Sequence, residues 1–253
     1  MEYLYLDTVD STNAFLLRQR EAERAGRVVL AREQTAGKGM GSNSWESQPG
    51  SNLTFSMGVD LSFLKAADQF LLSQAVPLGL LDCLDTLLPP EKLFVKWPND
   101  LLFDGRKLCG ILISSSIHGM EMGVSVIGIG LNVNQTQFLD WPTHPISLRM
   151  ILEKEVPLEP LLHDLVDAVE ARVEALKSPE GIEKTQMDYL RRLFLYHQWG
   201  DFETREGHVK LFVEGIDHFG RLITSDEQGI TRVYDLKELH LLTSHLSPLT
   251  SHL

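Results

Sequence analysis

The chain has 253 residues, of which 43% are hydrophobic and 23% are charged, and this balance excludes a chain that is mainly disordered. Its length predicts one large domain, or a medium domain with a small one attached. The formal net charge of −12 disfavours non-specific binding to nucleic acid or to an anionic membrane.

The cysteine count, the N-terminal residues and the lengths of the apolar stretches favour a cytoplasmic location. The two cysteines, Cys83 and Cys109, are too few for a disulfide scaffold or a four-cysteine zinc site. Residues 1–10 lack the basic stretch and apolar run of a signal peptide. No stretch reaches the roughly 18 apolar residues that a membrane span needs. We therefore expect a cytoplasmic protein with reduced thiols that binds neither nucleic acid nor membrane.

The first predicted helix covers about residues 12–25. Any of Asp10, Ser11 and Thr12 has the short polar side chain that caps a helix N-terminus. Gly26 stands where the end of a helix favours a left-handed residue.

Strands and helices alternate through the middle of the chain. Strand propensity is high at 27–32, 52–60, 93–97, 101–114 and 123–134. Apolar residues recur at helical spacing at 66–88, 158–177 and 180–195. Pro77 is expected to bend the first of these helices. The pair Asp104-Gly105 suits a tight primed turn, which makes 101–114 a hairpin.

The pattern changes after Gly200, where short strands follow one another at 208–216, 220–226 and 230–236. Such strands joined by glycine turns predict a small barrel or meander. The expected organisation is an α+β domain, a small all-β domain and a tail, at residues 1–198, 199–242 and 243–253.

Two polar stretches are candidates for ligand binding. In Gly37-Lys38-Gly39-Met40-Gly41, close glycines let the backbone approach a ligand and direct N–H groups at an anion, although the spacing is not that of a P-loop. The alternative is a mobile surface loop, and Trp45 nearby can be core or cover a flat ring. KWPNDL (96–101) places a cation, an amide and a carboxylate where a strand ends. Its alternative is a turn that bonds its own backbone.

Two further features lie in the strands. Lys107 enters an apolar run, where an ammonium group needs an anion or water unless the side chain extends to the surface. Gly128 and Gly130 weaken a strand, which indicates either the close approach of a ligand or a bulge without one.

Taken in order, these motifs resemble those of biotin–protein ligases over about residues 5–240. The matching elements are Asp10-Ser11-Thr12-Asn13, Gln34 to Gly39 with Trp45, KWPNDL (96–101), RKLCGIL (106–112) and GIGLNVN (128–134). The resemblance implies a mixed β-sheet flanked by helices, as in the catalytic domain shared by these ligases and class II aminoacyl-tRNA synthetases. It also implies a C-terminal Src-homology-3-like β-barrel.

The resemblance implies a two-step reaction. Biotin and ATP, the latter as its Mg²⁺ complex, give biotinyl-5′-adenylate and pyrophosphate. A lysine of a biotin carboxyl carrier domain then takes the biotinyl group. ATP, Mg²⁺ and biotin are thus substrates, and no tightly bound prosthetic group is expected.

The family's site residues are carried over onto matching positions. Biotin would be bound by Ser11, Thr12, Asn13, Gln34, Gly37, Lys38, Gly39, Met40, Lys107, Gly110, Gly128 and Gly130. ATP would be bound by Lys38, Asn43, Trp45, Lys96, Asn99, Lys107 and Asn132. The catalytic group would be Lys38, Lys96, Asp100 and Lys107, with Asn132 and Asp100 near the Mg²⁺ ion.

The sequence departs from the family's pattern in three ways. Lys38 is the one cation of its glycine loop, where many members carry arginines. Ser114 stands where the Gly-Ile-Leu element often ends in Glu. The repressor-type helix-turn-helix is missing, so a role in DNA binding is not expected. Two alternatives remain: a lipoate–protein ligase or octanoyltransferase, which KWPNDL disfavours, and a biotin sensor without catalysis, which the retained lysines disfavour.

Overall fold

The strands expected in the first two-thirds of the chain form one mixed sheet in the computed structural model, which describes residues 1–41, 43–138 and 145–242. Its order is β1-β2-β3-β7-β6-β5-β4. The pair β1–β2 is parallel and the other neighbours are antiparallel. The strands are β1 (Glu2–Val9), β2 (Arg27–Gln34), β3 (Leu53–Asp60), β4 (Leu93–Lys96), β5 (Asp100–Phe103), β6 (Arg106–His118) and β7 (Glu121–Leu131).

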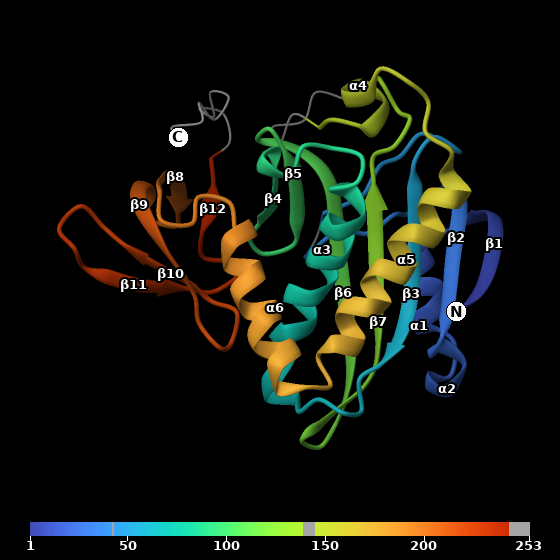
Figure 1. The fold of residues 1–253 in the computed structure, drawn as a ribbon, viewed down its shortest axis with the longest axis horizontal. Helices are drawn as coiled ribbons and strands as arrows, with labels where there is room; N and C mark the ends of the chain where they lie inside the picture. The colour runs from blue at the N-terminus through green and yellow to red at the C-terminus, as the bar shows by residue number, and fades with distance from the viewer. Residues whose placement is uncertain (42, 139–144, 243–253) are drawn as a thin grey trace.

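Helices cover the two faces of this sheet unequally (Figure 1). The long helices α3, α5 and α6 pack together on one face, whereas the short α1 and α2 contact β2, β3 and β7 from the other. The face with α1 therefore keeps room for a ligand site. The helices are α1 (Thr12–Leu17), α2 (Glu21–Arg24), α3 (Phe70–Leu84), α4 (Leu148–Leu152), α5 (Leu158–Ala175) and α6 (Pro179–Arg192), with 3-10 turns at Ala66–Asp68 and Pro90–Lys92.

The core lies between the sheet and the long helices. The helical periodicity predicted for α5 is confirmed, because Leu161, Leu165 and Val169 on its inner face are all buried. At Gly79 in α3, an added Cβ would lie 2.6 Å from the Cα of Val169, so only glycine lets the two helices approach this closely. Pro77 lies inside α3.

The prediction of one helix over residues 12–25 is wrong. The chain forms α1, turns at Arg20, which has the extended backbone of φ −63° and ψ 148°, and then forms α2. A tertiary contact accounts for the break: Glu21 accepts the N–H of Val124 at 2.7 Å, which holds α2 against β7. The expected left-handed residue is confirmed, since Gly26 has φ +73°.

The C-terminal strands form a second, antiparallel sheet with the order β11-β10-β9-β8-β12. Its members are β8 (Trp199–Thr204), β9 (Gly207–Ile216), β10 (Leu222–Ser225), β11 (Thr231–Tyr234) and β12 (His240–Leu241). The strands expected from the sequence did not include β1, β8 or β12, and α4 was not expected either; β12 and α4 are too short to show a period. Phe202, Leu211 and Leu222 belong to the same buried cluster as residues of the first sheet. The expected tail, 243–253, lies outside the described residues.

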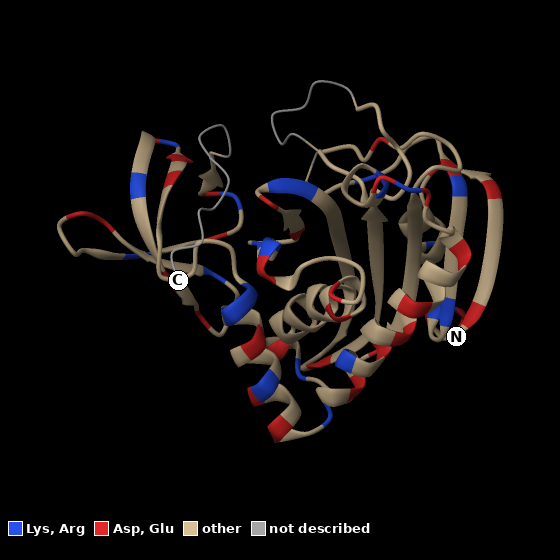
Figure 2. Cartoon of the chain, turned by 45° about the horizontal axis from the view of Figure 1, so that its top comes forward, with Lys and Arg blue, Asp and Glu red and all other residues tan. Residues whose placement is uncertain are grey.

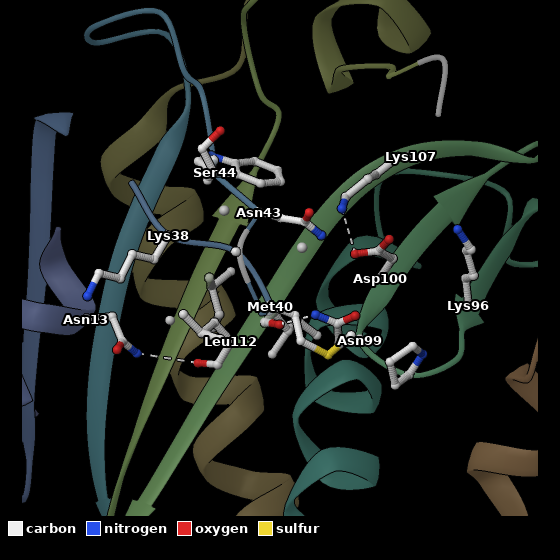
Figure 3. A pocket seen from close by; sticks show the side chains of 18 of the residues that line it. Asn13, Lys38, Met40, Asn43, Ser44, Lys96, Asn99, Asp100, Lys107 and Leu112 are labelled. Atoms are coloured by element: carbon white, nitrogen blue, oxygen red, sulfur yellow. Dashed lines mark hydrogen bonds and ion pairs between the residues drawn. The ribbon is translucent and has the colours of Figure 1, made fainter. Parts of the chain in front are cut away.

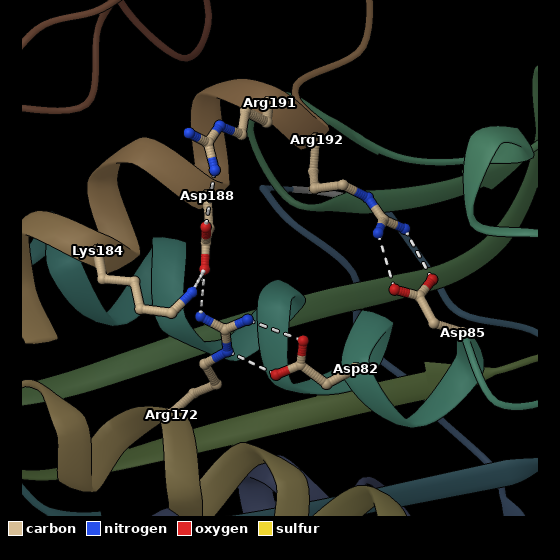
Figure 4. Close-up of polar contacts among 7 residues, drawn as sticks. All are labelled: Asp82, Asp85, Arg172, Lys184, Asp188, Arg191 and Arg192. Atoms are coloured by element: carbon tan, nitrogen blue, oxygen red, sulfur yellow. Dashed lines mark hydrogen bonds and ion pairs between the residues drawn. The ribbon is translucent and has the colours of Figure 1, made fainter.

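Ion pairs join the long helices (Figure 4). Charged residues lie along α5 and α6 (Figure 2), and some of them reach α3. Arg172 of α5 contacts Asp82 through two nitrogens at 2.5 and 2.8 Å and Asp188 of α6 at 2.8 Å. Arg192, at the end of α6, pairs with Asp85 at 2.8 and 2.9 Å. Bidentate pairs of this kind fix orientation, so α6 is held firmly beside α3.

None of the described helices combines the length and apolar composition that a membrane span requires.

Candidate functional site

A cavity of about 290 Å³ lies on the face of the first sheet that carries α1. Distant parts of the chain meet around it: the start of α1, the 37–45 loop, the β4–β5 turn, β6 with β7, and β12 of the second sheet (Figure 3). All predicted site residues except Gly37 and Asn132 line it, namely Ser11, Thr12, Asn13, Gln34, Lys38, Gly39, Met40, Asn43, Trp45, Lys96, Asn99, Asp100, Lys107, Gly110, Gly128 and Gly130.

A polar cluster occupies the end of the cavity beside α1. Ser11 caps the helix, since its hydroxyl accepts the N–H of Ala14 at 3.4 Å. The Oε1 of Gln34 accepts the N–H and the hydroxyl of Thr12 at 2.7 and 3.1 Å. The Thr12 hydroxyl also lies 2.8 Å from Oγ of Ser56 on β3. These contacts hold donors and acceptors in fixed positions, which suits the polar head of a small ligand.

The glycine loop at 37–45 turns back on itself. Lys38 and Ser44 form an antiparallel bridge, and the N–H of Gly39 donates to the carbonyl of Asn43 at 2.8 Å. The side chain of Lys38 is exposed. Residue 42 lies outside the described part of the loop.

The Trp45 ring packs closely against β6 and β7 because both strands carry glycine there. A Cβ on Gly130 would lie 2.3 Å from the Trp45 ring, and one on Gly110 would lie 2.9 Å from it. The ammonium of Lys107 lies 5.6 Å from the ring centroid. A Cβ on Gly37 would lie 2.3 Å from the Trp45 carbonyl oxygen, so Gly37 serves the loop's packing and does not line the cavity. The indole Nε1 is buried without a partner among the described residues.

Charged groups gather at the opposite end of the cavity. Lys96 and Asp100 are paired across the β4–β5 turn, and Lys107 Nζ lies 2.8 Å from Asp100 Oδ1. Figure 3 shows Lys96 and Lys107 on either side of Asp100, while Lys38 extends toward Asn13. Burial lowers the pKa of Lys96; the Asp100 charge opposes this effect and the Lys107 charge adds to it. The site thus concentrates positive charge, two ammonium groups against one carboxylate.

Both asparagines predicted to bind nucleotide donate to backbone carbonyls. The amide of Asn99 donates to Ile111 O at 2.6 Å, which fastens the β4–β5 turn to β6. Nδ2 of Asn132 donates to Ile146 O at 3.1 Å and to Lys107 O at 3.4 Å. Asn132 lines a smaller neighbouring cavity of about 80 Å³, together with Lys107.

The sequence did not indicate several lining residues. Ser56 lies on the ligand face of β3, and a buried serine within a predicted strand is the only signal of it. His240 and Leu241 of β12, and Leu239 just before it, reach the cavity. They are about 140 residues from the β4–β5 turn in sequence, and no motif marks them.

The site offers few acidic groups that could bind a metal ion. Asp100 is the one carboxylate among the residues that line the main cavity. The described residues contain no group of three or more His, Cys, Asp and Glu that could hold a metal. Because Mg²⁺ is commonly held by one or two carboxylates and by substrate phosphates, the site suits an ion that arrives with a nucleotide. It does not suit a resident metal cage.

Comparison with known proteins gives consistent matches. Residues 5–132 match the model of the biotin/lipoate A/B protein ligase family. The biotin–[acetyl-CoA-carboxylase] ligase of Paracoccus denitrificans is 32% identical over 232 residues, which cover 88% of this chain and 94% of that protein. The enzyme of the same name from Mycobacterium tuberculosis is 36% identical over 129 residues, 49% of this chain and 47% of that protein.

Solved structures agree in fold. The biotin protein ligase from Aquifex aeolicus in complex with biotin and ATP superposes with a TM-score of 0.78 at 20% identity, covering 95% of this chain and 98% of that one. The mixed seven-stranded sheet and the C-terminal antiparallel sheet are thus a known arrangement. From the family match and the nearly full-length relative, the chain belongs to the biotin/lipoate A/B protein ligase family.

Proposed function

We propose that the chain is an ATP-dependent biotin–protein ligase. It would form biotinyl-5′-adenylate from biotin and MgATP and transfer the biotinyl group to a lysine of a biotin carboxyl carrier domain. One observation carries this proposal: a single cavity holds a fixed polar cluster at one end and the Lys96–Asp100–Lys107 group at the other. That arrangement matches a ligand with a polar head and a carboxylate that must meet a triphosphate.

In the first step, a carboxylate oxygen of biotin attacks the α-phosphorus of ATP. The bond from that phosphorus to the bridging oxygen breaks, and pyrophosphate leaves with the electron pair. Two anions must approach, so the ammonium groups of Lys96 and Lys107 would lower the barrier by neutralising charge in a water-poor site. Thr12 and Gln34 would bind the ureido head and so align the carboxylate. Mg²⁺ would arrive with the phosphates.

In the second step, the acceptor amine attacks the acyl carbon of the adenylate, an amide forms and AMP leaves. The amine must lose a proton to react. Asp100 would orient the amine and take up the proton that it loses, while the bond from the acyl carbon to the phosphate oxygen breaks and AMP leaves with the electron pair. We assign this chemistry to residues 1–198 and regard 199–242 as a small domain that closes the cavity. The reaction would take place in the cytoplasm, where the buried free thiols of Cys83 and Cys109 stay reduced.

Labelling of an acceptor tests the function. The protein is incubated with MgATP, biotin and a carrier domain, and the product is blotted with streptavidin. Labelling that needs both ATP and biotin supports the proposal. Activity with lipoate alone would favour a lipoate ligase, and no labelling at saturating MgATP would favour a sensor.

Asp100→Asn should slow transfer from preformed biotinyl-adenylate at least about tenfold, the cost of one hydrogen bond to a charged group. Preformed adenylate separates this step from activation. Asp104→Asn is the control, because Asp104 lies in the β5–β6 turn at φ +50°, a conformation that asparagine tolerates. Unchanged transfer in Asp100→Asn would refute the role.

Biotin should protect the glycine loop from trypsin. Lys38 is exposed and its loop is joined by few bonds, so cleavage after Lys38 is expected in the free protein. Contacts between biotin and the loop should slow cleavage after Lys38 about fivefold at saturating biotin. Cleavage after Arg205, exposed in the β8–β9 turn, is the internal control. Equal rates at Lys38 with and without biotin would contradict this prediction.

A further inference from the structure

The three-residue turn between β4 and β5 carries two charged site residues at its ends. Lys96 is the last residue of β4 and Asp100 is the first residue of β5. Both line the cavity. Any shift of this turn therefore moves both reactive groups together, and a misplacement of about 1 Å can cost about 100-fold in rate.

The turn is held from two sides. On the first sheet, Asn99 bonds Ile111 through its side chain at 2.6 Å and its carbonyl accepts the Ile111 N–H at 2.9 Å. On the second sheet, the indole Nε1 of Trp97 donates to the carbonyl of Gly220 at 2.8 Å in a buried hydrogen bond. The residues of this second bond lie 123 positions apart in the chain.

The acceptor carbonyl has a fixed position. Gly220 has φ +87°, and a Cβ there would lie 2.2 Å from the ring of Phe70 at the start of α3. The carboxylate of Asp217 accepts the N–H groups of Phe219 and Arg221 at 3.0 and 2.9 Å, which closes the β9–β10 turn on itself. The turn therefore presents its carbonyl to Trp97 as a rigid element.

The contact region around Trp97 also includes Lys96. A cavity of about 30 Å³ between the two sheets is lined by Lys96, Trp97 and Leu239 with other apolar residues. The segment after α6 runs along the free edge of β4, where Phe194 N–H donates to Val95 O at 2.8 Å. This edge fixes the strand but does not reach the turn. Among the hydrogen bonds of the described residues, the Trp97–Gly220 bond is the one that ties the turn to the second sheet.

We propose that Trp97 is a positioning residue: through its hydrogen bond to Gly220, the second sheet sets the places of Lys96 and Asp100 in the cavity. The consequence for the reaction rests on the proposed ligase function. The polar cluster beside α1 does not depend on this bond, because Thr12 and Gln34 are held by one another and by Ser56. Loss of the bond should therefore impair the chemical step and spare the binding of biotin.

The test uses Trp97→Phe, which keeps an aromatic ring and removes the N–H donor. In biotin-dependent pyrophosphate release, kcat per folded molecule should fall about tenfold while KM for biotin stays within about twofold. Trp199→Phe is the matched control, because Trp199 is 43% exposed on the second sheet and should leave both constants unchanged. A kcat equal to that of the wild type, even with a lowered Tm, would show that Trp97 is merely structural.

A second variant and a second readout separate the positioning role of Trp97 from the proposed ligase function. Gly220→Ala should displace the same carbonyl, and combined with Trp97→Phe it should lower kcat no further than the worse single change. Full additivity would overturn the proposal.

Reductive methylation of Lys96, followed by mass spectrometry, needs no ligase activity. Trp97→Phe should raise the rate at which Lys96 is methylated several-fold and leave the rate at exposed Lys92 unchanged. An unchanged Lys96 rate also refutes the positioning role, whereas absence of biotin-dependent activity in the wild type refutes only the ligase.

Discussion

Lys107→Ala is expected to lower biotinyl-adenylate formation about 1000-fold and to leave the protein folded. Lys107 lies 2.8 Å from Asp100 and 5.6 Å from the centroid of the Trp45 ring, and we propose that its ammonium contacts both the biotin carboxylate and the α-phosphate. Loss of one preorganised group that stabilises developing charge costs about 100- to 1000-fold in kcat. Pyrophosphate release at saturating biotin and MgATP measures this loss.

Folding is checked separately in the same variant. The Lys107 side chain is partly buried and pairs with Asp100, but Lys96 remains near Asp100 as a second cation. Truncation of Lys107 should therefore change the circular dichroism spectrum little and lower Tm by a few degrees. Lys92→Ala, which removes an exposed lysine outside the cavity, should retain full activity. Global unfolding of Lys107→Ala would mean that this lysine is structural, and near-normal pyrophosphate release would remove it from the reaction.

Lys96→Met should lower adenylate formation about 100-fold and raise the stability of the protein. Lys96 is held near Asp100 and Lys107 in the cavity, where its charge would help to neutralise the phosphates. Burial of this ammonium is unfavourable for folding, as its lowered pKa indicates. Methionine has a similar length and no charge to bury, so Tm should rise while activity falls.

The stability gain of Lys96→Met should depend on pH. Between the lowered pKa of the folded protein and the ordinary value of 10.5, the unfolded wild-type chain binds more protons at Lys96 than the folded one. The free energy of unfolding of the wild type therefore rises with pH through this window. The advantage of the methionine variant should be largest below the window and disappear above pH 10.5. A gain that stays constant with pH would show that packing, and not the buried charge, is its cause.

Local signals in the sequence predicted much of this fold. Ser11 caps α1 because a short hydroxyl side chain satisfies a free N–H there. Asp104 and Gly105 form the expected turn, with φ values of +50° and +75°, because both residues tolerate the left-handed region. The break between α1 and α2 could not be predicted, because it depends on Glu21, which bonds a strand about 100 residues away.

The candidate site, like the fold, was predicted only in part from the sequence. Ordered motifs predicted most of the lining residues, and Lys107 and Asp100 lie close because β5 and β6 form one hairpin. The residues that the second sheet contributes to the cavity were not predicted. Leu239 and Leu241 reach the cavity, and Gly220 accepts the bond from Trp97, only after the two sheets pack together. Sequence patterns of period two or 3.6 contain no information on such packing.

We propose that one cavity brings the carboxylate of biotin to the α-phosphate of ATP beside two lysines. Exchange of labelled pyrophosphate into ATP measures this step directly, without an acceptor protein. We expect exchange that requires biotin, that lipoate cannot support in its place, and that is lost in Lys107→Ala. Exchange that is independent of biotin, or that is unchanged in Lys107→Ala, would contradict it.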